Sequence, residues 1–224
     1  MRKIFITLVI ALFAMSANAQ LSPYREFSVF EKNHYWFEAG ASYNTISTRH
    51  TDYKLGYRGG FGADIPLLYS WVSFLPSILF ETKGYTSEMM RDLALCTTDM
   101  MSMYVEVPVN FSLNLPIGKK MGVQICAGPF LACGIAGSYT ESSDNYLGLY
   151  GTRSLEYKAF RNDDEDVNLL KNIDFGVDLG LRFIFFRYAM VKVNSEFGCI
   201  NISAKEGTPA FRSRSFSASI AIRL

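Results

Sequence analysis

The chain has 224 residues, of which 49% are hydrophobic, 15% aromatic and 19% charged. This composition excludes an intrinsically disordered chain, and the length suits one large domain. The formal net charge of +1 excludes a strongly basic surface, so we expect no nucleic acid partner. Two histidines and four cysteines provide little for His-based catalysis, a metal centre or a dense disulfide framework.

The first residues have the organisation of a secretory signal peptide. Arg2 and Lys3 precede a short apolar segment, residues 4–15, and residues 17–19 (Ala-Asn-Ala) fit a cleavage site. The apolar segment is too short to span a bilayer as a helix, although an N-terminal anchor helix is the alternative. We therefore expect the chain to divide into a signal peptide, residues 1–19, a polar lead-in, residues 20–35, and one folded domain, residues 36–224.

In the folded domain, apolar and polar residues alternate with the period of two that is typical of β-strands. The clearest run is 101–115, where Val105, Val107 and Val109 share one face. The expected strands are residues 36–49, 53–67, 74–85, 101–115, 120–139, 173–186, 190–203 and 212–224. Short links alternate with longer ones, which indicates an all-β fold, an eight-stranded antiparallel up-and-down transmembrane β-barrel. The longest links are 86–100, which could hold one or two helical turns, and 140–172.

The charges indicate which face of each strand points outward. The apolar faces carry no charge, and the opposite faces are rich in Gly and Ser rather than Lys and Glu, so these small polar faces suit a crowded barrel interior. The ionisable residues on the inner faces are nearly balanced in charge, as a closed interior requires. The acidic ones are Glu38, Asp64, Glu81, Glu106, Asp178 and Glu196, and the basic ones are Arg58, Lys83, Arg182, Lys192 and Arg223.

We expect most of these inner charges to form one connected network. Its predicted members are Glu38, Arg58, Glu81, Glu106, Asp178, Arg182, Lys192, Glu196 and Arg223. The alternative is that the balance arises by chance in a small set. The prediction implies that the interior is filled with side chains and does not form a wide channel.

Aromatic residues near the strand ends support the membrane interpretation. Two girdles of Tyr and Trp are typical of the two lipid–water interfaces. The expected members are Trp36, Tyr69, Trp71 and Tyr188 at the short-turn end, and Tyr53, Tyr85 and Tyr139 at the long-loop end. The final run, residues 216–224, alternates up to the last residue, so it can close the barrel against the first strand.

Three short motifs resemble those of PorT-like outer-membrane β-barrel proteins. They are Tyr104-Val105-Glu106-Val107-Pro108, Gly128-Pro129-Phe130, and Asp174-Phe175-Gly176 continuing through Asp178 to Gly180. Their order and strand placement carry the resemblance, which runs over about residues 36–224. It implies an eight-stranded barrel in the outer membrane of a Gram-negative bacterium. It does not imply one activity, although the founding member is linked to protein secretion.

Two motif residues have a physical interpretation. Glu106 is expected to point inward, where a cation such as Arg58, Arg182 or Lys192 neutralises it. Pro108 removes a hydrogen-bond donor from the ladder, so we expect a bulge or bend beside Glu106.

Evidence for chemistry is sparse. His50 with Asp52 could act as an acid–base pair at the rim, and His34 precedes the barrel, but a solvated turn is the more common role for such residues. The acidic run 163–166 could bind a divalent cation, although it lacks the spacing of a calcium loop. We therefore expect no catalytic residues, no metal and no cofactor.

The sequence favours a non-enzymatic outer-membrane protein that uses its long loops for structural or interaction roles. The alternatives are an accessory component of a secretion or envelope-assembly system and, third, an enzyme with a site at the rim. The expected partners are outer-membrane lipid and lipopolysaccharide, the barrel-assembly machinery during biogenesis, and a protein partner for which the long loops are candidate sites.

Overall fold

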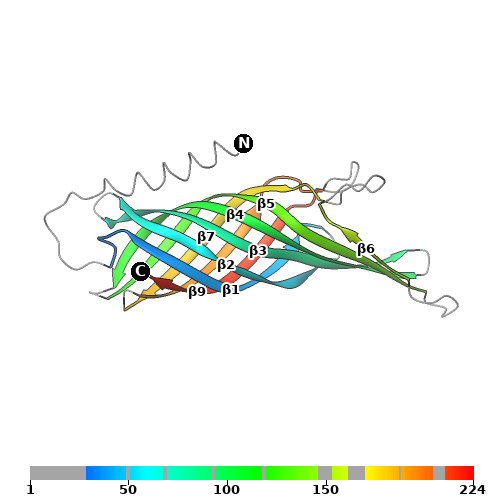
Figure 1. Cartoon of the computed structure of the whole chain (residues 1–224), viewed down its shortest axis with the longest axis horizontal. Coiled ribbons are helices and arrows are strands. Elements are labelled where there is room, and N and C mark those ends of the chain that lie inside the picture. The colour runs from blue at the N-terminus through cyan, green and yellow to red at the C-terminus, as the bar shows by residue number, and fades with distance from the viewer. Residues whose placement is uncertain are drawn as a thin grey trace.

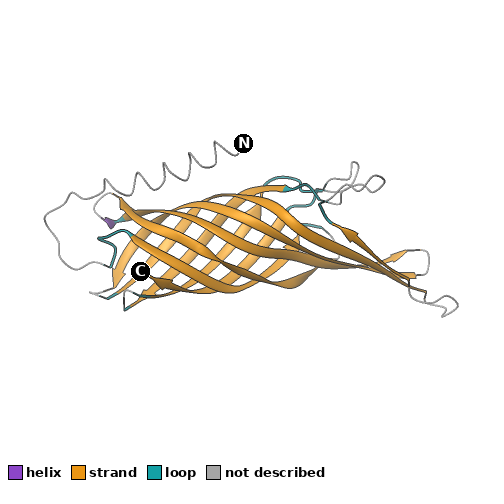
Figure 2. Cartoon of the chain, in the orientation of Figure 1, coloured by secondary structure: helices purple, strands orange, loops and turns teal. Residues whose placement is uncertain are grey.

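A computed structural model of the chain describes residues 29–48, 51–67, 70–91, 94–117, 120–145, 153–160, 170–186, 188–203 and 210–224. Figure 2 shows that strands form nearly all of the described structure. The strands are β1 (His34–Ile46), β2 (Thr51–Leu67), β3 (Val72–Arg91), β4 (Ala94–Ile117), β5 (Met121–Asn145), β6 (Arg153–Lys158), β7 (Ile173–Phe185), β8 (Ala189–Gly198) and β9 (Ser213–Arg223). No helix of the described residues is long and apolar enough to cross a bilayer.

The sheet closes on itself as an antiparallel ring. β1 pairs with β2 on one side and with β9 on the other, and pairings β2–β3, β3–β4, β4–β5, β5–β7, β7–β8 and β8–β9 complete the circle. At the seam, Tyr35 and Leu224 exchange two backbone hydrogen bonds of 3.2 and 2.7 Å. β6 lies outside the ring and pairs with β5. The predicted eight-stranded up-and-down barrel is therefore confirmed.

Side chains alternate between a polar interior and an apolar exterior. In β9, every second residue is buried, and the buried ones are Ser213, Ser215, Ser217, Ser219, Ala221 and Arg223. The exposed residues between them include Phe216, Ile220 and Ile222. A soluble barrel would have the opposite arrangement, whereas hydrocarbon outside and polar groups inside suit a membrane-spanning barrel.

Three strands extend far beyond the ring, which corrects the prediction of a long loop or short helix at residues 86–100. β3, β4 and β5 continue side by side past one end of the barrel, and β6 joins them there (Figure 1). The ladder reaches Arg91↔Ala94 between β3 and β4, and Ala94↔Asn145 between β4 and β5. Outside the membrane neither face must be apolar, so the period-two pattern that identified the other strands fades there. The second predicted loop, residues 140–172, likewise contains the end of β5 and all of β6.

Apolar clusters close both ends of the interior. We call the cluster at the short-turn end the short-turn seal and the cluster at the other end the second seal. At the short-turn end, Val29 and Phe30 are buried together with Trp36, Leu79, Ile184, Met190 and Ala221. At the other end, the buried residues are Ile46, Tyr85, Met100, Ala159, Leu170 and Ile202. The lead-in is therefore not wholly polar and exposed, because Val29 and Phe30 pack inside the barrel and β1 already begins at His34.

The predicted aromatic girdles are partly wrong, because some of their members pack into the apolar clusters inside the barrel. Trp36 and Tyr85 occupy inward phases of their strands and are 1% and 5% exposed, so they belong to the two seals. Tyr139 is partly buried against the second seal. Trp71, Tyr188 and Tyr53 are exposed, as a girdle requires. Tyr69 lies outside the described residues.

Candidate functional site

Seven buried charged side chains lie on the inner faces of five strands and form one continuous network of ion pairs. They are Glu38 from β1, Arg58 from β2, Glu81 and Lys83 from β3, Glu106 from β4, and Lys192 and Glu196 from β8. We call these seven residues the lumen network. Strand alternation puts them inside, and the narrow bore of an eight-stranded ring lets long side chains from opposite walls meet.

Arg58 is the hub of the lumen network. Its Nε lies 3.1 Å from Glu38 Oε1, its Nη1 lies 3.0 Å from Glu81 Oε2, and Nη1 also pairs with Glu196 Oε1. The planar guanidinium presents several donors in fixed directions, so one arginine can serve three carboxylates at once. Lys192 pairs with the other oxygen of Glu38 and connects β8 to β1.

Lys83 is the second link of the network. Its Nζ lies 2.8 Å from Glu106 Oε2 and 2.9 Å from Glu196 Oε2, so it joins the motif carboxylate to the hub. The same ammonium lies 4.8 Å from the ring centroid of Phe130, a cation–π distance. The sequence suggested Arg58, Arg182 or Lys192 as the cation that neutralises Glu106. In the structure this cation is Lys83. Alternation identified the inward cations, but it could not say which one reaches Glu106.

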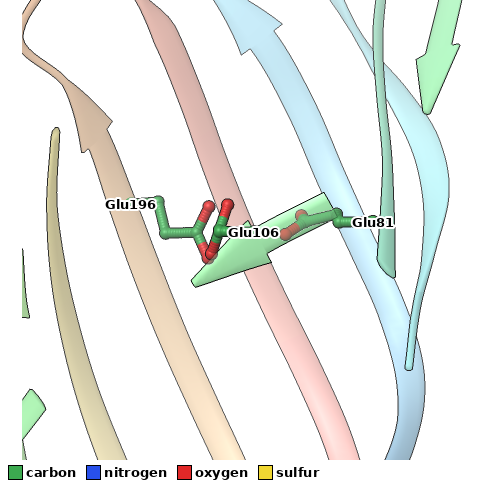
Figure 3. A group of neighbouring side chains, drawn as sticks. All are labelled: Glu81, Glu106 and Glu196. Atoms are coloured by element: carbon green, nitrogen blue, oxygen red, sulfur yellow. The ribbon is translucent and has the colours of Figure 1, made fainter. Parts of the chain in front are cut away.

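Three carboxylates of the network come close enough to be considered as metal ligands. Oxygens of Glu81, Glu106 and Glu196 all lie within 4.8 Å of one another, and Figure 3 shows the three side chains converging. Arg58 and Lys83 already pair with these carboxylates. A metal ion would have to displace a buried cation, so the arrangement is better suited to crosslinking strands than to holding a metal.

Three predicted members of the network lie elsewhere in the lumen. Arg223 pairs with Asp64 at 2.9 Å near the short-turn seal, and its Nη1 donates to the Val29 carbonyl at 2.8 Å. Asp178 accepts hydrogen bonds from Asn110 and from Asn194, the latter at 2.9 Å. The prediction of a single network is therefore wrong for Asp178 and Arg223. Asp178 is bound by two asparagine amides, and Arg223 pairs with Asp64 instead of with the lumen network.

Arg182 is the third exception. Its guanidinium lies 5.1 Å from the Trp36 ring, and no ion pair joins it to the lumen network in the described chain. Its Nε and Nη1 are buried without a hydrogen-bond partner among the described residues. Lys192 also lies over this ring, at 3.7 Å. Trp36 therefore faces two cations through its π-system, an inward role that the sequence analysis did not identify.

The interior is filled rather than open along its axis. Between Lys83 and the second seal lies a cavity of about 20 Å³, lined among others by Asn44, Ser102 and Tyr104. A cavity of this size holds about one water molecule. Asn44 Oδ1 is buried and lacks a partner among the described residues, so it is a suitable acceptor for such a water.

The motif residues gather on three neighbouring strands, β4, β5 and β7. Pro108 is opposite Phe130, Phe130 is opposite Gly176, and Gly128 is opposite Asp178. A Cβ on Gly176 would lie 2.7 Å from Phe130 Cε1, so the glycine makes room for the ring. The other motif positions fit the same wall: Tyr104 and Asp174 are buried, Pro129 is opposite Val177, and Gly180 abuts the Asn194 side chain.

The bulge expected beside Pro108 lies elsewhere. The β3–β4 register runs from Leu79↔Glu106 to Pro76↔Val109 without a shift. The irregularity lies in the β4–β5 ladder, where Met103 pairs with Ala136 and Tyr104 with Gly134. A proline removes a donor without requiring an extra residue in the strand, so Pro108 can interrupt the ladder and leave its register intact.

Other sequence candidates are only partly described. His50, the acidic run 163–166 and the signal peptide lie outside the described residues. Asp52 is exposed in β2, and His34 Nδ1 lies 3.1 Å from the Leu224 carbonyl oxygen at the barrel seam.

Several solved structures resemble this chain at low sequence identity. Similar solved structures include Ail of Yersinia pestis, with a TM-score of 0.41 and 9% identity over 86% of this chain and 99% of that chain. Neisserial surface protein A has a TM-score of 0.41 and 12% identity over 88% and 99% of the two chains. The N-terminal barrel of Pseudomonas aeruginosa OprF has a TM-score of 0.32 and 10% identity over 84% and 97%.

No curated protein matches the sequence. A family model described as "Outer membrane protein beta-barrel domain" matches residues 18–203, which is most of the chain. The assignment rests on this match together with the closed ring and its apolar exterior. The chain belongs to the outer membrane protein β-barrel family and is an integral protein of the outer membrane.

Proposed function

We propose that the protein is a non-enzymatic outer-membrane anchor that presents a rigid β-sheet projection to a protein partner. The projection consists of residues 88–100 of β3 and β4, residues 138–145 of β5, and β6. The observation that carries the proposal is strand length. A membrane-spanning strand needs about 9–11 residues, whereas β4 has 24 and β5 has 25.

The projection has the features of an interaction surface. The β2–β3 ladder ends at Thr51↔Ser87, so the last residues of β3 have no neighbouring strand on that side in the described chain. Exposed Met89 and Met90 lie on this free edge, at 55% and 63% exposure. A free edge offers backbone donors and acceptors to an added strand, and methionine adapts to many apolar partners. Short turns face the periplasm in such barrels, so the projection is extracellular.

The rim-enzyme alternative has less support. Of the candidate pair, His50 lies outside the described residues and Asp52 is exposed in β2, while His34 is at the seam where β1 meets the C-terminal residue. The buried carboxylates of the lumen network are sealed from solvent at both ends by apolar clusters. These features favour a structural role for the interior charges, and no observation favours the secretion alternative.

The test is to remove the tip of the projection. Ser87 and Thr98 are cross-strand neighbours, so residues 88–97 can be replaced by Asn-Gly, which favours a tight two-residue hairpin. A photo-crosslinking residue at Met90 in the intact chain should capture one defined protein on the cell surface. The same residue at Leu113, on the lipid face, is the control. A Met90 probe that captures only lipid would contradict the proposal, provided that the chain still shows heat-modifiable mobility.

We also infer that the chain belongs with the PorT-like barrels, on the strength of the packed motif unit of β4, β5 and β7. The unit is tested with Gly176→Ala, whose Cβ would lie 2.2 Å from the Phe197 carbonyl oxygen and 2.7 Å from Phe130 Cε1. Gly59→Ala is the matched control, since its Cβ would meet its nearest neighbour at 3.4 Å. We expect a loss of refolding yield for the first variant and none for the second. Equal yields would remove the structural reason for the motif.

A further inference from the structure

Exposed basic residues continue the lipid-facing side of β9 beyond its apolar part. Arg214 follows the same outward phase as Phe216 and Ile220, and Arg212 is exposed just beyond it. For tilted strands, the distance from Phe216 to Leu224 corresponds to roughly 20 Å of height, close to the ~25 Å apolar band of such barrels. Arg214 therefore lies at the outer edge of the band, where hydrocarbon gives way to head groups.

The neighbouring side of the rim repeats this arrangement. On β7, Ile173 and Phe175 are exposed and apolar, and Lys171, two residues before Ile173, is exposed in the same phase. Lys171 Nζ donates to the Asn201 carbonyl at 3.2 Å, which holds the ammonium at the rim. Arg212 and Arg214 have no carboxylate partner among the described residues. These three residues, Lys171, Arg212 and Arg214, are called the basic rim below.

The exposed acidic residues of the same end lie on its opposite side. Glu88, Asp99 and Glu141 are exposed on β3, β4 and β5. Lys54, the cation beside them, is already paired with Asp99. Lys158 of β6 is exposed on the same side, so the charges there are mixed, whereas the described residues beside Arg212 and Arg214 include no exposed carboxylate.

Aromatic side chains mark the head-group level beneath the basic rim. Tyr43 and Tyr53 stack with centroids 5.5 Å apart, and both are exposed. Arg214 is the cross-strand neighbour of Phe197, which is also exposed. Exposed rings near arginines that lack a carboxylate partner in the described part of the chain are the arrangement expected where acyl chains end and anionic groups begin.

We propose that the basic rim binds the phosphate groups of lipopolysaccharide in the outer leaflet. Arginine binds phosphate with two parallel hydrogen bonds, and at the edge of the apolar band the phosphates of the lipid anchor are the anions within reach. The lipid is favoured over a protein partner because the cations continue the lipid-facing phase. The site is separate from the projection, so it does not rest on the proposed partner binding.

The experiment compares lipid binding to the detergent-folded full chain by native mass spectrometry. The probes are lipid A with two phosphates, lipid A without phosphates, and phosphatidylglycerol. The variant is Arg212→Gln with Arg214→Gln, both on the outer surface, and heat-modifiable mobility checks that it folds. The control, Lys32→Gln with Lys120→Gln, removes the same charge from exposed positions at the opposite rim.

We expect the arginine variant to bind the bisphosphorylated lipid about 30-fold more weakly, or about 2 kcal/mol in all, from about 1 kcal/mol per basic residue near an anionic surface. The control should change binding less than twofold, and lipid A without phosphates should bind weakly to every chain. The proposal fails if the arginine variant binds as tightly as the wild type. It also fails if the control loses as much affinity, or if phosphatidylglycerol binds the wild type as tightly as bisphosphorylated lipid A.

Discussion

In the lumen, Arg58 joins three carboxylates whose side chains are at most 2% exposed, whereas on the outer surface the Lys54–Asp99 pair leaves the carboxylate 51% exposed. The two regions contain the same kinds of residue in different solvents. Between apolar seals, an ion that loses its partner finds little water to replace it, so its burial becomes uncompensated. At the surface, water replaces the lost partner and salt screens what remains. Charge position, and not charge count, therefore decides how much each residue stabilises the barrel.

Removing the hub of the lumen network should have the largest effect. Arg58→Met leaves Glu38, Glu81 and Glu196 with fewer cations than carboxylates, and we expect a loss of about 3–5 kcal/mol in the free energy of unfolding. The measurement is urea unfolding of the barrel refolded in lipid vesicles. A loss below about 1 kcal/mol would show that the lumen is wet and screened.

A charge on the outer face should have the next largest effect. Val107 lies in the outward phase of β4 between the inward Glu106 and Pro108, so Val107→Arg places a cation near the middle of the bilayer. We expect a cost of about 2–4 kcal/mol in the same unfolding measurement. Lys120→Arg, at the exposed short-turn rim, is the control. A harmless Val107→Arg variant would contradict the assignment of this face to lipid.

Glu106→Gln should be milder than removal of the hub. Glu106 has Lys83 as its ion partner, and its Oε1 is buried without a hydrogen-bond partner among the described residues. The amide keeps an acceptor for Lys83, and Lys83 keeps Glu196, so we expect a loss of about 1–3 kcal/mol. Glu196→Gln, which weakens links to both Arg58 and Lys83, should cost more. The reverse order would mean that Glu106 is the more important link.

The surface pair should show the smallest effect. Asp99→Asn removes the partner of Lys54 where the carboxylate is half exposed, and we expect a change below about 1 kcal/mol that becomes smaller in high salt. The measurement is the same unfolding series at low and high ionic strength. A loss comparable with that of Arg58→Met would remove the distinction between the two regions.

The fold could be predicted because a membrane barrel imposes one rule on every residue of its wall. Each outward position between the interfaces meets hydrocarbon, so alternation alone identified Val107 as outward and Arg58 as inward. Beyond the membrane an outward residue meets water, so alternation is not required there. The segments of β3 and β4 that contain Glu88 and Thr97 were therefore interpreted as a loop. Trp36 was placed in a girdle because its residue type outweighed its inward phase.

The candidate site could be predicted only in part. Phase placed Glu38, Glu81, Glu106 and Glu196 in the interior, but pairing depends on height along the axis and on strand stagger, which a single sequence does not reveal. Lys83 was therefore recognised as inward and yet not as the link between Glu106 and Glu196. Asp178 was grouped with the ions although two asparagines satisfy it.

The ring closure also has a consequence for the order of assembly. Glu38 pairs with Lys192, and Arg58 with Glu196, across sequence separations of 154 and 138 residues, while Ser215 of the last strand donates to Glu81 at 2.8 Å. A nascent chain that has inserted only β1 to β4 therefore exposes Glu38 and Arg58 without their β8 partners. Such long-range pairings make folding slow, because the closing contacts come last. The charged interior of the early strands is therefore buried with its partners only when β8 and β9 arrive, so the late strands complete the burial of the interior charges.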